Sequence, residues 1–183
     1  MRIVVDLQAC QSGSRLGGIG RYSMNLVEAM IRQCGEHELI IVLNDLFPET
    51  IPDMYESIEK ILPKKQIRVF SAPGPVYEYN AENRFRARSA EIIRERFISD
   101  LNPDIVHIAS LIEGLGDNVI SSVGRLFPGD KTSVTLYDLI PLVEQEKYLQ
   151  EKVVKDHYFA KIEEIKKAGS LLAISEFSAQ EAI

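Results

Sequence analysis

The sequence predicts a doubly wound α/β domain built on a mostly parallel sheet. Short runs rich in Val, Ile and Leu alternate with longer segments of helical periodicity. The short runs are apolar throughout, which is typical of parallel strands covered by helices on both faces. The chain has 183 residues, 45% of them hydrophobic, which suffices for one such domain with a full core.

The expected strands are short aliphatic or β-branched runs bounded by polar residues, glycine or proline. They cover residues 2–7, 39–43, 66–70, 104–109, 132–137 and 170–174. Each is expected to be buried between two layers of helices.

Helices are expected between these strands, where apolar residues recur at helical spacing. They cover residues 19–34, part of 48–63, and residues 83–101, 117–127 and 152–168. The inward face of the first helix is expected to hold Ile19, Tyr22, Leu26, Met30 and Cys34. That of the 83–101 helix is expected to hold Phe85, Ile92, Ile93 and Phe97, and that of the last helix Val154, Tyr158, Ile162 and Ile165.

The last residues carry a capping box, Ser178-Ala-Gln-Glu181, which predicts a helix that starts at Ser178. The sequence stops within about two turns of that start, and a helix so short is marginal alone. We therefore expect this chain to be part of a longer protein.

Composition excludes several classes of function. The net charge of −6 argues against a protein that binds nucleic acid by neutralising phosphates. Two cysteines, Cys10 and Cys34, are too few for a disulfide framework, and no cluster has metal-ligand spacing. No apolar run approaches the ~20 residues that span a bilayer. The short apolar start is no signal peptide, so we expect a cytoplasmic protein.

Candidate site residues follow the strands, because ligands of open α/β sheets bind outside the carboxyl ends of the strands. The strongest feature is Gly17-Gly18-Ile19-Gly20-Arg21, where a loop enters the first helix. Free N–H groups at a helix start suit a phosphate or a sugar hydroxyl, and Arg21 could add a charged contact. The alternative is that the glycines only allow the turn. The spacing matches neither a Walker A motif nor a dinucleotide fingerprint.

Two further loops carry polar residues at strand ends. Tyr137 and Asp138 follow the fifth expected strand, where they could bond sugar hydroxyls; alternatively Asp138 caps the turn before Pro141. Glu113 and Gly114 lie in a glycine-containing loop after the fourth strand, which either closes over a substrate or is simply solvated.

For the remaining histidines and arginines we expect structural or surface roles. His107 lies inside a strand and is expected to be a core residue, whereas His37 and His157 are expected on the surface. The arginines that open the 83–101 helix are expected to form a solvated face, with an anion site as the minority alternative; they are Arg84, Arg86 and Arg88. No G-x-S-x-G nucleophile motif occurs.

Four segments together resemble a known family. Gly17-Gly-Ile-Gly-Arg-Tyr22 and its helix are similar to the first glycine loop of the family 4 retaining glycosyltransferases, which have the GT-B fold. Thr135-Leu-Tyr-Asp-Leu-Ile-Pro141 resembles their segment after the fifth strand, and residues 171–178 resemble the strand and helix start that close their N-terminal domain. Residues 106–114 are similar to a loop of bacterial members that build surface polysaccharides. The segments keep the family's order over nearly the whole chain.

The resemblance implies that residues 1–183 form one Rossmann-like, acceptor-side N-terminal domain. A C-terminal domain absent from this chain would bind most of the nucleotide sugar, so the chain alone should be inactive. The implied reaction transfers a sugar from a nucleotide-sugar donor to a glycan or lipid-linked glycan, as in lipopolysaccharide synthesis, with no cofactor and no metal. The implied partners are the donor, the acceptor and the chain's own C-terminal domain, without nucleic acid. Peripheral contact with the inner face of a membrane is a hypothesis.

The resemblance also implies residue roles. Gly17, Gly18, Gly20 and Arg21 would contact the donor diphosphate or the acceptor, together with Glu113 and Gly114. Asp138 and Tyr137 would be catalytic. Many family members have His-Asp where this chain has Tyr137-Asp138, which makes Asp138 the firmer candidate.

Two alternatives remain open. One is a nicotinamide-dinucleotide-binding oxidoreductase domain, in which Asp45 after the second strand would bind a ribose. The other is a non-catalytic sugar-binding lobe. Binding of NAD would favour the first, and unchanged function after loss of Arg21 or Asp138 would favour the second.

Overall fold

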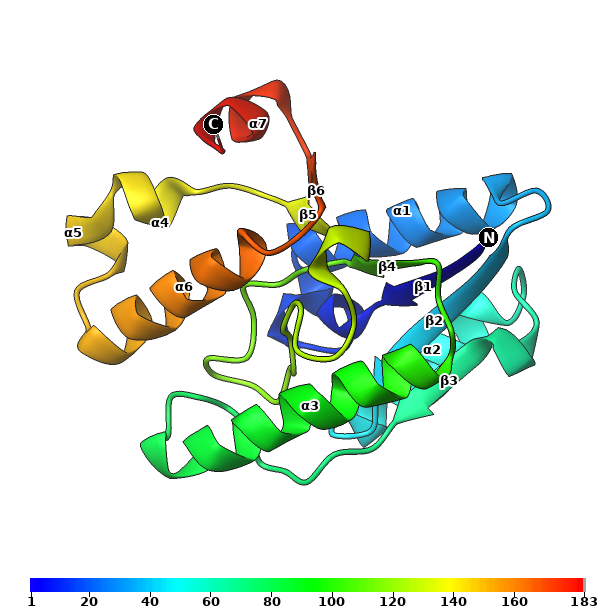
Figure 1. The fold of residues 1–183 in the computed structure, drawn as a ribbon, viewed down its shortest axis with the longest axis horizontal. Helices are drawn as coiled ribbons and strands as arrows, with labels where there is room; N and C mark the ends of the chain where they lie inside the picture. The colour runs from blue at the N-terminus through cyan, green and yellow to red at the C-terminus, as the bar shows by residue number, and fades with distance from the viewer. Residues whose placement is uncertain (183) are drawn as a thin grey trace.

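The computed structural model describes residues 1–182, whose strands form one six-stranded, entirely parallel sheet (Figure 1). The strands are β1 (Arg2–Asp6), β2 (Glu38–Asn44), β3 (Ile67–Phe70), β4 (Ile105–Ile108), β5 (Thr132–Leu136) and β6 (Ser170–Ala173). Their order across the sheet is β3-β2-β1-β4-β5-β6. The predicted doubly wound, Rossmann-like α/β class is confirmed.

The strand order reverses between β1 and β4. The chain winds from β1 to β3 toward one edge and then returns to place β4 on the other side of β1. Val5 of β1 pairs with Ile41 of β2 on one side and with His107 of β4 on the other. The carboxyl ends of β1 and β4 therefore flank the crevice in which doubly wound sheets bind their ligands.

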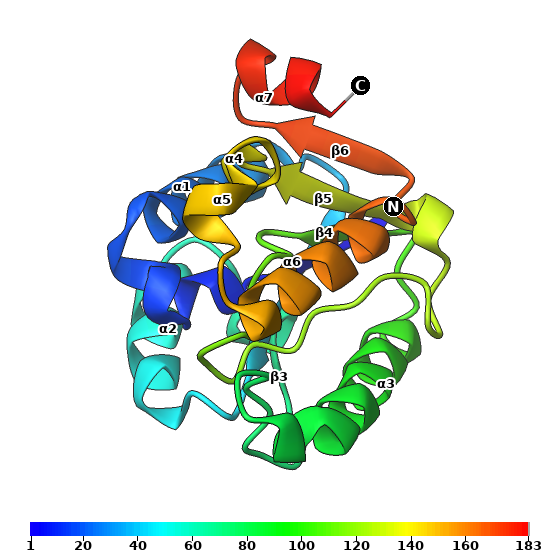
Figure 2. The ribbon, with the colours of Figure 1, turned by 90° about the vertical axis from the view of Figure 1, so that its left-hand side faces the viewer.

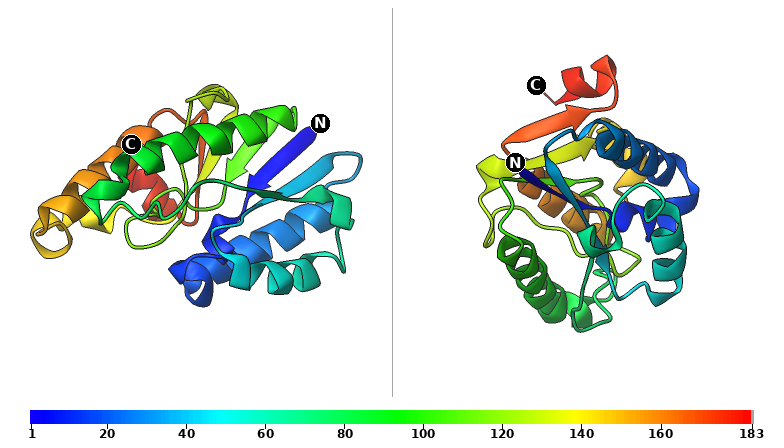
Figure 3. Two further views of the ribbon diagram at one scale, coloured as in Figure 1. Left: turned by 90° about the horizontal axis from the view of Figure 1, so that it is seen from below. Right: turned by 90° about the vertical axis from the view of Figure 1, so that its right-hand side faces the viewer.

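Helices cover both faces of the sheet (Figures 2 and 3). Helices α1 (Gly18–Gln33) and α2 (Ile51–Ile58) lie on one face, and α3 (Arg84–Asp100) and α6 (Lys152–Ile165) lie on the other. Neighbouring β1 residues point to opposite cores: Val5 packs in the cluster that contains Val27 of α1, and Val4 packs in the cluster that contains Ile98 of α3.

The expected inward face of α1 is right only in part, since Ile19 and Met30 pack against the buried core as expected. The buried residues of this helix are Gly20, Ser23, Val27 and Ile31, whereas Tyr22 is exposed. A Cβ added at Gly20 would lie 2.5 Å from the backbone of Arg15. The backbone of the preceding loop therefore packs against Gly20, and the larger residues Ile19 and Met30 lie beside the buried stripe.

The expected inward face of α3 is wrong at two of its four positions. Phe85 is 85% exposed and Ile92 is also exposed, while Ile93 and Phe97 pack against the core as expected. The buried residues of this helix include three charged side chains, Glu91, Arg94 and Glu95. A hydrophobicity pattern cannot identify a buried face that consists largely of charges with partners on distant segments.

The expected helix over 117–127 does not form. This segment is irregular, and side chains bind its backbone groups. The Glu95 carboxylate accepts hydrogen bonds from the N–H groups of Arg125, Leu126 and Phe127 at 2.7, 2.6 and 3.2 Å. Because these N–H groups have side-chain acceptors, the segment needs no helical hydrogen bonds.

The end of the described chain also departs from expectation. Strand β6 is a partly exposed edge, with Leu171 and Leu172 accessible. Helix α7 (Glu176–Glu181) is capped by Ser175, three residues before the expected capping residue Ser178, because the hydroxyl of Ser175 accepts from the N–H of Ser178. Two short helices that were not expected, α4 (Ile140–Val143) and α5 (Gln145–Tyr148), follow β5. Within residues 1–182, no helix has the length and apolarity to span a bilayer.

Candidate functional site

A pocket of about 160 Å³ opens where β4 and β5 end. The segment after β4 contributes Ser110 and Ile112, and the segment after β5 contributes Tyr137 and Asp138. Tyr158 of α6 forms part of the far wall. The pocket therefore lies at the carboxyl edge of the sheet, beside the reversal of strand order, as the sequence predicted for a site.

Tyr137 connects three segments at this edge. Its hydroxyl lies 2.9 Å from the hydroxyl of Ser23 on α1 and donates to the carbonyl of Ala109 after β4 at 3.1 Å. Its ring packs edge-on against Tyr22, with 5.7 Å between the ring centroids. Burial raises the pKa of Tyr137 to about 12, so the phenol stays protonated at neutral pH. Tyr137 thus fixes one wall of the pocket and presents no charge to it.

Asp138 is exposed at the rim of the same pocket. Its Oδ1 accepts a hydrogen bond from the N–H of Ile140 at 3.1 Å, at the start of α4. The turn-capping role that the sequence allowed is therefore present. The carboxylate also borders the pocket, so the two interpretations of Asp138 are compatible.

Glu113 and Gly114 lie in a loop that borders a second pocket of about 230 Å³. Glu113 is buried, its Oε1 accepts from the hydroxyl of Ser110 at 3.1 Å, and burial raises the pKa of its carboxyl. Gly114 has φ +88°, and a Cβ there would lie 2.5 Å from the carbonyl oxygen of Val119. The backbone thus requires glycine at 114, whatever the loop binds.

The glycine loop divides into two parts. Gly20 is a packing residue, whereas Gly17 and Gly18 are exposed where α1 begins, and a Cβ at Gly18 would meet no atom within 4 Å. Within residues 1–182, no side chain caps this helix start. The Nε of Arg21 donates to the carbonyl of Gly17 at 3.4 Å, so Arg21 bends back over the loop. The open part of the loop is therefore the Gly17–Gly18 step beside Arg21.

The glycine loop also touches the Glu113 loop. The N–H of Gly13 donates to Oδ2 of Asp117 at 3.4 Å. Through this contact and the Tyr137–Ser23 bond, the three predicted segments adjoin one another at the same edge of the sheet. The roles predicted for their residues remain predictions.

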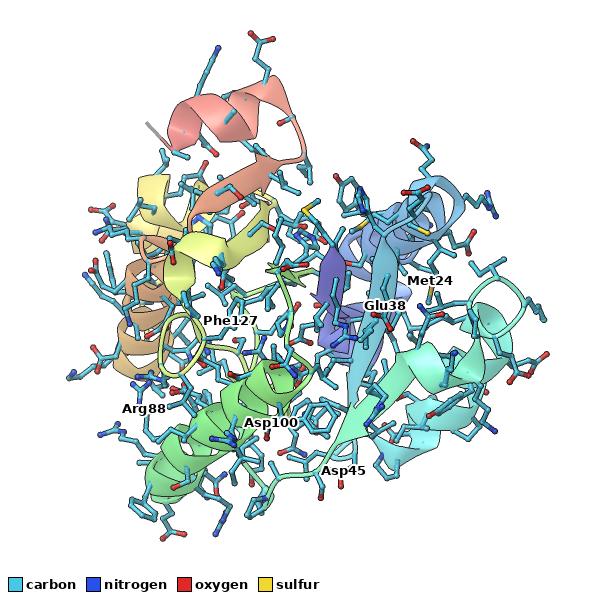
Figure 4. The ribbon with its side chains drawn as sticks, turned by 45° about the vertical axis from the view of Figure 1, so that its right-hand side comes forward. Met24, Glu38, Asp45, Arg88, Asp100 and Phe127 are labelled. Atoms are coloured by element: carbon cyan, nitrogen blue, oxygen red, sulfur yellow. The ribbon has the colours of Figure 1, made fainter. Side chains whose placement is uncertain are left out.

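Other candidates take structural roles. The ring nitrogens of His107 lie 2.8 and 3.1 Å from the hydroxyls of Ser133 and Thr135, and burial lowers its pKa to about 4. Arg86 donates to the carbonyl of Pro75, and Arg88 pairs with Glu91. Figure 4 shows Arg88 on the side of α3 that is nearest α6, away from the glycine loop.

The expected surface position of His157 is wrong. His157 is buried, and it borders the second pocket together with its neighbour Tyr158. The sequence pattern of α6 placed Tyr158 on the inward face but not His157. A histidine one position beside an apolar stripe gives no signal that it faces a cavity.

The chain has relatives among curated proteins. Over its whole length it is 34% identical to a protein of Escherichia coli described as the serotype-specific mannosyltransferase WbdA, of which it covers 22%. Two further E. coli proteins with the same description are 34% and 33% identical over 85% of the chain. The chain thus spans about a fifth of the length of these relatives. No protein-family model matches it, and no solved structure matches it. The chain is therefore similar over its whole length to part of a WbdA mannosyltransferase, and the predicted resemblance to a glycosyltransferase is confirmed.

Proposed function

We propose that this chain is the acceptor-side N-terminal domain of a retaining glycosyltransferase of the GT-B fold. It would move a mannosyl group from a nucleotide-sugar donor to a glycan or lipid-linked glycan. The observation that carries the proposal is the similarity of the whole chain to proteins described as mannosyltransferases. The crevice at the carboxyl edge of the sheet supports it, because three polar segments adjoin one another there.

The proposed chemistry is mostly positioning and charge stabilisation. The N–H groups at the start of α1, beside Gly17 and Gly18, would donate hydrogen bonds to the diphosphate of the nucleotide sugar, whose negative charge suits the positive end of a helix. Arg21 would swing from the Gly17 carbonyl to the same phosphates. Asp138 and Glu113 would hold sugar hydroxyls, so that the acceptor oxygen lies near the anomeric carbon.

A second domain completes the proposal. It would bind most of the nucleotide sugar across the crevice, and this chain alone would not catalyse transfer. We place the enzyme in the cytoplasm, with peripheral contact at the membrane where a lipid-linked acceptor is presented. No cofactor is part of the proposed reaction, and the nucleotide sugar enters as a substrate.

The oxidoreductase alternative has less support. Dinucleotide-binding folds place their glycine turn directly after the first strand. Here residues 7–17, with two short 3₁₀ turns, lie between β1 and α1. The relatives carry the name of a transferase.

The test measures transfer by the full-length protein. It compares the wild type with Asp138→Asn and Asp138→Ala, using a nucleotide-diphosphate mannose and a mannose-containing acceptor. The amide oxygen of Asn can still accept from the Ile140 N–H, so Asp138→Asn removes the charge and keeps the cap. We expect both variants to lose at least ~10-fold in kcat, which corresponds to about 1.4 kcal/mol of transition-state binding.

The outcomes separate two roles of Asp138. Loss of transfer in Asp138→Ala alone would assign Asp138 to the turn that it stabilises through the Ile140 N–H and remove it from catalysis. A wild-type protein that transfers no sugar from any nucleotide donor, yet binds NAD, would replace the proposed function by the oxidoreductase alternative.

A further inference from the structure

Ser178 and Glu181 have the spacing of a capping box, but their side chains bind a distant segment of the chain. In a capping box, each side chain would bind a backbone N–H group in the first turn of its own helix. Here α7 is capped by Ser175, whose hydroxyl accepts from the Ser178 N–H at 3.1 Å. The side chains of Ser178 and Glu181 are therefore available for contacts outside α7.

Both side chains bind the backbone on either side of Asp138. The hydroxyl of Ser178 donates a hydrogen bond to the carbonyl of Tyr137. Oε2 of Glu181 accepts a hydrogen bond from the N–H of Leu139 at 3.2 Å. The partners lie 41 and 42 positions apart in the sequence, so α7 holds the segment after β5 by tertiary contacts.

A pair of hydroxyl groups fixes the first of these contacts. Ser178 has one hydroxyl proton, which the carbonyl of Tyr137 accepts. The hydroxyl of Ser175 lies 3.0 Å from the hydroxyl of Ser178 and therefore donates to it. Ser178 is only 3% exposed, so this arrangement is shielded from water. The start of α7 is thus bound firmly to the end of β5.

The two contacts restrict the backbone angles of Asp138. The Tyr137 carbonyl belongs to the peptide group before the Cα of Asp138, and the Leu139 N–H belongs to the peptide group after it. Because peptide groups are planar, only the two rotations between them set the direction of the Asp138 side chain. Helix α7 holds both groups, and the Ile140 N–H holds Oδ1 of the carboxylate at 3.1 Å.

Asp138 needs such support because of its position. It is exposed at the rim of the first pocket, in the link between β5 and the short helix α4. A carboxylate that orients a substrate must keep its place to within about 0.5 Å. Packing does not hold an exposed side chain so closely, whereas hydrogen bonds to both neighbouring peptide groups do.

We propose that Ser178 and Glu181 are positioning residues, which hold the backbone around Asp138 so that its carboxylate stays in place at the first pocket. This role rests on the proposed function, in which Asp138 orients a sugar. Among the described residues, the wall of this pocket includes Asp138 but neither Ser178 nor Glu181, so both would act through Asp138.

The test is a double-mutant comparison in the full-length protein, with the donor and acceptor used for the Asp138 variants. Ser178→Ala and Glu181→Ala should each lower kcat/KM by ~2–12-fold, the loss of one hydrogen bond. In an Asp138→Ala background neither should lower kcat/KM further, because no carboxylate is left to position. A residue that acts independently of Asp138 would cause the same loss in both backgrounds.

Two variants on the same helix sharpen the test. Glu181→Gln should lose less activity than Glu181→Ala, because its amide oxygen can still accept from the Leu139 N–H. Glu176→Ala removes an exposed carboxylate from the first turn of α7, and its kcat/KM should equal that of the wild type. If Ser178→Ala does not fold, the Glu181 variants decide the outcome, since Glu181 is only partly buried.

Hydrogen exchange separates the positioning role from the proposed function. The Leu139 N–H should exchange faster in Glu181→Ala than in the wild type, whether or not the protein transfers sugar, and unchanged exchange would overturn the positioning role. Transfer by the wild type with unchanged kcat/KM in both alanine variants, or with equal losses in the Asp138→Ala background, would reject the positioning role and keep the transferase. No transfer by the wild type, with faster exchange in Glu181→Ala, would reject the transferase and keep the hold of α7 on the Asp138 backbone.

Discussion

Both helical layers of this domain pack apolar residues against the sheet, but only the layer that contains α3 also buries a set of charged side chains. Helix α1 buries small and apolar residues, among them Val27 and Ile31. Helix α3 is of similar length but buries Arg94 and Glu95, which bind partners far away in the sequence. The first layer is a conventional apolar contact. The second layer fixes the irregular 117–127 segment. In this segment the Ser121 hydroxyl donates to the carbonyl of Leu111, which lines the first pocket, and Asp117 borders the second pocket, so the charged layer supports the candidate site.

Loss of Arg94 should cause the largest effect. Its Nε donates to Oδ2 of Asp6 at 2.5 Å, and both side chains are buried. Arg94→Leu leaves a buried carboxylate unpaired, which costs about 3–5 kcal/mol of unfolding free energy. Chemical denaturation measures this loss. Arg96→Leu is the control, because Arg96 is exposed on the same helix, and removing its pair with Asp100 should cost less than ~1 kcal/mol. Equal losses in the two variants would contradict a charged core on this face.

Glu95→Gln should have the next largest effect. The carboxylate accepts from the hydroxyl of Ser122 at 2.6 Å and from three successive backbone N–H groups. A glutamine has one acceptor oxygen, and its NH₂ group would face donors. We expect a loss of about 1.5–3 kcal/mol, the value of hydrogen bonds to a charged group. Hydrogen exchange should show faster exchange at residues 125–127, and unchanged exchange there would contradict this role.

Acid should destabilise the layer of α3 and α6 through Glu78. This residue lies between β3 and α3 and pairs with His157 and Lys161 of α6. Burial raises the pKa of this carboxyl, but the imidazole of His157, whose Nδ1 lies 3.4 Å from Oε2, and the charges of Lys161 and Arg88 lower it to about 2. Because the folded pKa lies below the unfolded value near 4.5, the stabilisation is present above pH 4.5. It is lost as the pH falls from 4.5 toward 2. We expect this loss to be on the order of 2 kcal/mol. This loss should be absent in Glu78→Gln when the unfolding free energy of both proteins is measured as a function of pH. The same pH dependence in wild type and variant would reject the stabilising role of the Glu78 ion pairs.

The apolar layer should respond least. Ile31 lies on the buried face of α1, and Ile31→Val removes one methylene group from a packed core. We expect a loss of about 0.5–1.5 kcal/mol, with no change in its pH dependence, because no titratable partner is involved. A loss that grows as the pH falls would show that the two layers do not differ as described.

The same contrast explains what the sequence predicted. The strands and the class of fold were predicted because Val and Ile runs report burial directly. The face of α3 was not, because Glu91, Arg94 and Glu95 look like solvent-exposed residues unless their partners are known. The helix expected over residues 117–127 was wrong for the same reason. The backbone N–H groups of this segment bond to the carboxylates of Glu95 on α3 and Glu164 on α6, and the local sequence does not reveal these acceptors.

The candidate site was predictable in its location and less so in its members. The rule for strand ends brought Tyr137, Asp138 and Glu113 to one edge of the sheet, and they lie there. The same rule could not find His157, which reaches the second pocket from a helix. Nor could spacing separate the packing glycine, Gly20, from the open glycine, Gly18.

The Glu95 carboxylate has a consequence for how this domain can vary. It binds the backbone of residues 125–127, so the path of that segment is encoded on α3, about 30 positions earlier in the chain. The side chain of Leu126 is exposed and does not enter this arrangement. Substitutions at position 126 can therefore accumulate during evolution, or be selected from a library, without changing the shape of the segment. A single helical residue thus lets the exposed surface at position 126 vary in sequence while the backbone path stays the same.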